Sequence, residues 1–143
     1  MALVEQLRAD VVQAMKAGER DRAGALRLVL SELQKAAKDG EEDEQAVLRR
    51  ERKRRLDAAE QYEAAGRPEL AAGEQREAEL ITGYLPAELE DEELGRLVGE
   101  AVSRTGASSP KDMGAVMKDV MAAAGGRADG RRVSARVREA LGA

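Results

Sequence analysis

The chain has 143 residues, of which 24 are basic and 28 acidic, and it contains no cysteine, histidine, phenylalanine or tryptophan. The absence of cysteine excludes disulfides and thiolate chemistry, and the absence of histidine removes the commonest general base and metal ligand. We therefore expect no metal and no cofactor. The length suits one compact domain or two small ones.

The composition favours helices along the whole chain. Strong helix formers dominate, whereas the only aromatic residues are Tyr62 and Tyr84, so the sequence predicts an all-α protein. Charges at Glu5, Arg8 and Asp10 interrupt the N-terminus, unlike a signal peptide. No segment has the roughly 18 uncharged apolar residues of a membrane span. We expect a soluble cytoplasmic protein without a membrane partner.

Apolar residues recur at helical spacing through the first part of the chain. Gly18, Gly40 and Gly66 follow three of these patterns as stops, and Pro68 suits the first turn of a helix. Asp21 is the expected N-cap of the second helix. The pattern predicts four helices, over about 3–17, 21–39, 43–65 and 68–83.

The third predicted helix contains a basic run, RRERKRR at residues 49–55. Taken alone the run suggests a nucleic-acid patch, but the acidic residues within and after it, from Glu51 on, favour ion pairs along a solvated helix. The apolar stripe weakens between Leu48 and Leu56, so part of the helix should project beyond the core or meet a partner. One hypothesis is therefore a protein-interaction module that uses the helix at 43–65.

A domain boundary is predicted where the sequence reads GYLPAELEDEEL, at residues 83–94. Pro86 forces the preceding residue towards an extended conformation and ends the fourth helix, and the acidic residues that follow favour a new helix start. We expect an N-terminal helical domain over 1–87 and a C-terminal three-helix bundle over 88–143. Its helices are predicted at about 90–104, 110–124 and 129–141.

The second helix of this bundle has a well-specified start, because Ser109 can act as a cap and Asp112 approximates a capping box. Methionine and valine then recur at helical spacing and predict a core stripe of Met113, Val116, Met117, Val120 and Met121. Gly114 interrupts this helix. Because a mid-helix glycine costs about 1 kcal/mol relative to alanine, it suggests the close approach of another helix or of a ligand.

Positive charge is concentrated near the C-terminus, since residues 107–143 carry seven basic and four acidic groups. Arg127, Arg131 and Arg132 crowd the start of the last helix, where unpaired N–H groups already create a partial positive charge. Either these arginines are solvated side chains without a functional role, or they form a binding site for an anion such as phosphate. In the second case, replacing all three by glutamine should leave stability unchanged or slightly raised.

The candidate site extends to neighbouring basic and glycine residues, because Lys118 lies one helix before this start and Arg136 one turn beyond Arg132. The predicted RNA-binding residues are Lys111, Gly114, Lys118, Gly126, Arg127, Arg131, Arg132 and Arg136. This segment has no aromatic residue on which single-stranded bases could stack. The ligand would therefore be folded RNA, read through its phosphates and shape.

Catalytic constellations are nearly absent from the sequence. No serine lies in a nucleophile elbow, and neither G-x-x-x-x-G-K-[ST] nor G-x-G-x-x-G occurs. We expect no catalytic residues and no enzymatic activity by this chain alone.

Several motifs carry a resemblance to a known family. AGRPEL with a downstream GYLP, ASSPKDMGAVMK and GRADGRRV resemble the GatB/YqeY family over the full length, as a stand-alone YqeY-like protein. The resemblance implies an N-terminal helical domain and a C-terminal domain similar to the tail of the B subunit of glutamyl/aspartyl-tRNA amidotransferase. Similar modules are appended to some glutaminyl-tRNA synthetases, and in those settings the tail contacts tRNA.

The resemblance carries over residue by residue. Gly114, Met117 and Lys118 match the tail's G-x-x-M-K, and GRAD at 126–129 matches its G-[KR]-A-[DN]. Ser134 departs from the family's usual Asn. The amidotransferase's ATP-using domain and its amidase partner have no counterpart in this sequence. The activity of a carbon–nitrogen ligase with glutamine as amide donor would therefore be assigned to this chain only through its resemblance to the family, not through catalytic residues of its own.

The leading hypothesis is a non-catalytic accessory protein that binds tRNA or another structured RNA through its C-terminal domain. An alternative is a component of a tRNA-dependent amidotransferase reaction that acts with partner subunits. Expected partners are therefore RNA, an aminoacyl-tRNA synthetase or amidotransferase subunits. The third hypothesis remains the protein-interaction module at 43–65.

Overall fold

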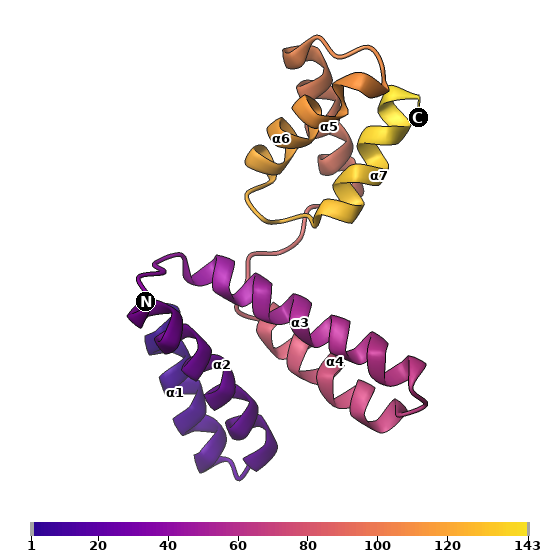
Figure 1. Cartoon of the computed structure of the whole chain (residues 1–143). Helices are drawn as coiled ribbons and strands as arrows, with labels where there is room; N and C mark the ends of the chain where they lie inside the picture. Colours follow the sequence, from indigo (N-terminus) through magenta and orange to yellow (C-terminus); the bar gives the residue numbers. More distant parts are fainter. Residues whose placement is uncertain (1, 143) are drawn as a thin grey trace. The chain divides into compact units, whose positions relative to one another are not determined.

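The computed structural model describes residues 2–142 and divides the chain into two compact units, an N-terminal unit up to Leu85 and a C-terminal unit from Pro86 (Figure 1). The division falls slightly before the expected limit at residue 87. Within the described residues the secondary structure consists of seven α-helices and one short 3₁₀ helix, with no strand. The prediction of an all-α fold is confirmed.

The N-terminal unit consists of two helical hairpins. The first pairs α1 (Leu3–Lys16) with α2 (Arg20–Lys38), and the second pairs α3 (Glu44–Ala64) with α4 (Pro68–Thr82). The prediction that Asp21 caps α2 is wrong, because the helix begins at Arg20 and Asp21 lies in its first turn. Gly18 adopts a positive φ of 76° and turns the chain so tightly that α2 begins two residues later.

The main core of this unit lies within the first hairpin and at one end of the second. Large buried side chains come chiefly from α1 and α2, whereas α3 adds only Val47 and Leu48, and α4 only Ile81. Farther along, α3 and α4 pack through the buried alanines Ala59 and Ala71. The weak apolar stripe therefore marks a part of α3 that lies outside the main core, as predicted.

The C-terminal unit is a bundle of α5 (Asp91–Thr105), α6 (Met113–Ala124) and α7 (Gly130–Leu141), with a 3₁₀ helix, η1 (Pro110–Asp112), before α6. The 3₁₀ geometry at 110–112 was not predicted. It arises where the Asp112 carboxylate accepts hydrogen bonds from the backbone N–H groups of Ser108 and Ser109, at 2.9 and 3.3 Å. These bonds tighten the first turn and set the direction of α6.

The core of this bundle is built from one face of each helix. Its largest fully buried side chains are Leu94, Val116, Val120, Val133 and Val137. Met113 and Met117 are half-buried against this cluster, but Met121 is 37% exposed. Its assignment to the core stripe was wrong, because it lies only one residue beyond Val120, which takes the inward position on that turn.

Across residues 2–142, no helix is both long enough and apolar enough to cross a membrane.

Candidate RNA-binding surface

The start of α7 is already capped by the chain itself. Gly125 and Gly126, with φ of 57° and 82°, end α6 and turn the chain. The Asp129 carboxylate then accepts a hydrogen bond from the backbone N–H of Arg132 at 2.8 Å. This bond satisfies one of the free donors of the helix terminus and places a negative charge beside it. The terminus is thus partly compensated before any ligand binds.

Arg127 connects this turn by hydrogen bonds to the segment that precedes α5. Its Nε donates a hydrogen bond to the carbonyl oxygen of Ala87 at 2.8 Å, and its own carbonyl accepts one from the N–H of Leu89 at 2.7 Å. Leu89 is buried in the core of the bundle. Arg127 therefore fastens the segment that leads into α5 against the turn between α6 and α7.

Arg132 and Arg136 are directed at α5. Nη2 of Arg132 lies 2.7 Å from Oδ1 of Asp91. One turn along both helices, the guanidinium of Arg136 occupies the room beside Gly95, where a Cβ atom would collide with it. A carboxylate of its own domain is therefore already the partner of Arg132, which the sequence analysis did not foresee.

The ion pair changes the acidity of Asp91. The hydrogen bond from Arg132, followed by the positive charges of Arg132 and Arg136, lowers the pKa of Asp91 below its ordinary value. A carboxylate with a lowered pKa contributes stability at neutral pH, and this contribution is lost as the pH falls through the folded-state pKa.

Replacing Arg132 by glutamine is expected to raise the pKa of Asp91 towards the ordinary value of an aspartate, because the strongest hydrogen bond to its charged form is removed. A titration of the carboxyl ¹³C shift measures this pKa directly. The control is Arg138→Gln, which changes an exposed arginine of the same helix and should leave Asp91 unaffected. An unchanged pKa in Arg132→Gln would show that the ion pair is not formed in solution.

Four basic side chains of residues 107–143 remain exposed to solvent: Lys111 on η1, Lys118 on α6, and Arg131 and Arg138 on α7. Arg131 and Arg138 are seven residues apart, which places them on one face of α7 two turns from each other. Arg138 was not among the predicted residues. The signal that would have found it is this seven-residue spacing from Arg131.

Gly114 and Lys118 share an exposed face of α6, one turn apart. Apart from its chain neighbours and the backbone of its own helix, no heavy atom lies within 4 Å of the position that a Cβ of Gly114 would take. Close approach of another helix among the described residues is therefore not the reason for this glycine. Gly126 is half-buried at the turn, where its positive φ gives it a backbone role.

The carboxylates of residues 107–143 are mostly engaged within the bundle. Asp112 accepts from the backbone N–H groups before α6, Asp129 caps α7, and Asp119 pairs with Arg104 of α5 at 2.7 Å. Because residues 107–143 carry seven basic and four acidic groups, this segment has a positive net charge.

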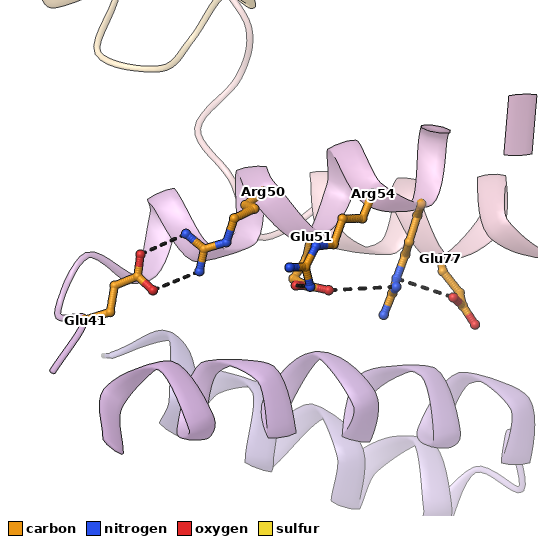
Figure 2. A network of polar contacts seen from close by, with 6 residues as sticks. Glu41, Arg50, Glu51, Arg54 and Glu77 are labelled. Carbon is orange, nitrogen blue, oxygen red and sulfur yellow. Dashed lines mark hydrogen bonds and ion pairs between the residues drawn. The ribbon is translucent and has the colours of Figure 1, made fainter. Parts of the chain in front are cut away.

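The basic run on α3 is not a comparable surface. Arg50 makes two hydrogen bonds of 2.8 Å to Glu41, and Arg54 lies 3.0 Å from Glu51 (Figure 2). Glu51 is only 4% exposed. The prediction of ion pairs is confirmed, but their description as a solvated face is corrected for Glu51, because the packing of neighbouring helices encloses it.

Among residues 2–142, no group of three or more carboxylates is placed to hold a metal ion. The helices of the described residues form two all-α units, and the second unit carries four exposed cations on η1, α6 and α7. The family model of Yqey-like proteins matches residues 4–141. Because this match covers nearly the whole chain, the protein belongs to the YqeY family. No curated protein matches it at a significant level.

Proposed function

We propose that this protein binds tRNA or another structured RNA through four exposed cations of its C-terminal unit, Lys111, Lys118, Arg131 and Arg138, and that it carries out no chemistry itself. The observation that supports this proposal is the division of charges in the bundle. Three of the four carboxylates in residues 107–143 are engaged in bonds within the bundle, whereas these cations are exposed.

Such a surface recognises RNA through its phosphates. Lysine and arginine that contact phosphate release counterions and supply most of the affinity of non-specific and shape-dependent binding. Neither tyrosine of the chain lies in the C-terminal unit, so base stacking has no platform there and folded RNA is favoured over single strands. The open face at Gly114 lets an RNA backbone approach next to Lys118.

Changing the four exposed cations to glutamine together is expected to weaken tRNA binding and to flatten its salt dependence. The slope of log K against log salt should become shallower by about 0.9 for each duplex phosphate that the protein no longer neutralises. Filter-binding titrations over a salt series measure both quantities. An unaltered affinity and slope would exclude this surface as the RNA-binding site.

The matched control removes four exposed cations from the N-terminal unit: Arg8, Lys16, Arg20 and Lys38. The net charge then changes equally, but binding should stay close to that of the unmodified chain. Arg127 and Arg132 are left unchanged in both sets, because they make contacts within the C-terminal unit, with Ala87 and Asp91. Because these contacts are lost in the triple glutamine variant of Arg127, Arg131 and Arg132, we now expect its stability to fall, whereas the sequence alone predicted an unchanged or slightly raised stability.

A further inference from the structure

The middle of α3 presents a leucine to solvent. Leu56 is 44% exposed and lines a groove of about 370 Å³ with Glu60 and Glu63 of α3 and Gln75 of α4. A separate polar pocket is lined by Glu51 together with residues at the end of α2. Glu51 therefore faces α2. Leu56 follows Glu51 by five residues, which is about 140° around a helix. The groove therefore lies on a flank of the α3–α4 hairpin that is turned away from α2.

Charges on this flank are arranged symmetrically about Leu56. Arg49, Arg52, Leu56, Glu60 and Glu63, here named the α3 stripe, are spaced by three, four, four and three residues and so share one helix face. The two basic residues precede the leucine and the two acidic residues follow it at equal separations. When two α3 helices lie antiparallel, the basic half of each stripe is therefore opposite the acidic half of the other.

We propose that two copies of this chain associate through the α3 stripe, with their α3 helices antiparallel and a two-fold axis at Leu56. Each Arg49 then faces Glu63 of the second copy, and each Arg52 faces Glu60. A parallel arrangement would place like charges opposite each other, so the pattern selects the antiparallel one. Arg52 also has an interaction within its own chain, and the outer pairs, Arg49 with Glu63, are the primary contacts.

The expected association is weak. From Arg49 to Glu63 the helix rises only about 21 Å. One helix face of this length buries less surface than the usual interface, which covers about 800 Å² per partner. Exposed ion pairs are also screened by salt. The dimer should therefore form in a concentration-dependent way and dissociate as salt is added.

Charge reversal tests the arrangement directly. Neither Arg49→Glu with Arg52→Glu nor Glu60→Arg with Glu63→Arg should self-associate, because each stripe then carries a single sign. An equimolar mixture of the two variants should associate at least as well as the unmodified chain, since all four pairs are complementary. Sedimentation velocity over a concentration series measures the mass, and circular dichroism verifies that each variant is helical.

A chain with all four substitutions serves as the internal control, because it restores the self-complementary pattern and should dimerise again. The proposal is overturned if the unmodified chain stays monomeric throughout the series, if either double variant self-associates like the unmodified chain, or if their mixture does not associate.

A cross-link tests the two-fold axis. The chain has no cysteine of its own, so Leu56→Cys places a single thiol at the proposed axis. Mild oxidation should give a covalent dimer rapidly. Val12→Cys, at another exposed apolar position on α1 (49% exposed), should cross-link many times more slowly by random collision. Equal rates for the two variants would contradict the arrangement.

Discussion

Replacing Leu94 by alanine is expected to lower the free energy of unfolding of the C-terminal unit by about 3 kcal/mol, because a fully buried side chain leaves a cavity in a small core. Leu94 has no exposed surface and packs within the cluster that holds α5, α6 and α7 together. Urea denaturation followed by helix content measures the loss. Leu97→Ala, at a half-buried position of the same helix, should have a clearly smaller effect.

The same variant connects stability with the proposed function. The two units have separate core clusters, so in Leu94→Ala the C-terminal unit should unfold first as urea is added. Binding of tRNA should be lost with it while the first helical hairpin remains folded. Leu26→Ala makes an equal deletion at a fully buried site of α2. This variant should leave tRNA binding intact under all conditions in which the C-terminal unit stays folded. Loss of binding in Leu26→Ala alone would move the RNA-binding site to the N-terminal unit.

Replacing Glu51 by alanine should destabilise the N-terminal unit by about 2 kcal/mol. Glu51 lies 3.9 Å from Arg55, whose side chain is 15% exposed and whose Nε lies 3.3 Å from Glu77. Removal of Glu51 leaves this mostly buried guanidinium with one carboxylate in place of two, and an incompletely paired buried charge is strongly unfavourable. Denaturant unfolding of the purified chain measures the difference.

Asp57→Ala, at an exposed acidic position of the same helix, is the control and should have little effect. In the double variant Glu51→Ala, Arg55→Ala, the loss should be smaller than the sum of the two single losses, because the unpaired charge is gone. If Glu51→Ala alone were as stable as the unmodified chain, Glu77 would be a sufficient partner for Arg55.

Helix positions were predictable because their signals are local. Gly18, Gly40 and Gly66 each adopt a positive φ just beyond a helix, and glycine is the residue that such a position favours. Pro68 begins α4 in the first turn, where its missing N–H has no partner to lose. The error at Asp21 was a shift within one turn, and several neighbouring polar residues there would fit the cap equally well.

The candidate site was predictable only in part. Lys111, Lys118 and Arg131 are exposed as a ligand-binding role requires, whereas the guanidinium groups of Arg127 and Arg132 are engaged with Ala87 and Asp91. These partners lie about forty residues earlier in the chain. A basic residue at a helix start carries no local sign that distinguishes a paired arginine from an exposed one.

The sequence by itself determined the helical class, most of the helix ends and the accumulation of positive charge near the C-terminus, because each depends on composition or on residues within a turn of one another. Only the tertiary structure decided which charges are paired within the fold. The packing of α7 on α5 brings Arg132 to Asp91, and the enclosure of α3 buries Glu51 beside Arg55. Both depend on contacts between helices, which helical periodicity does not encode.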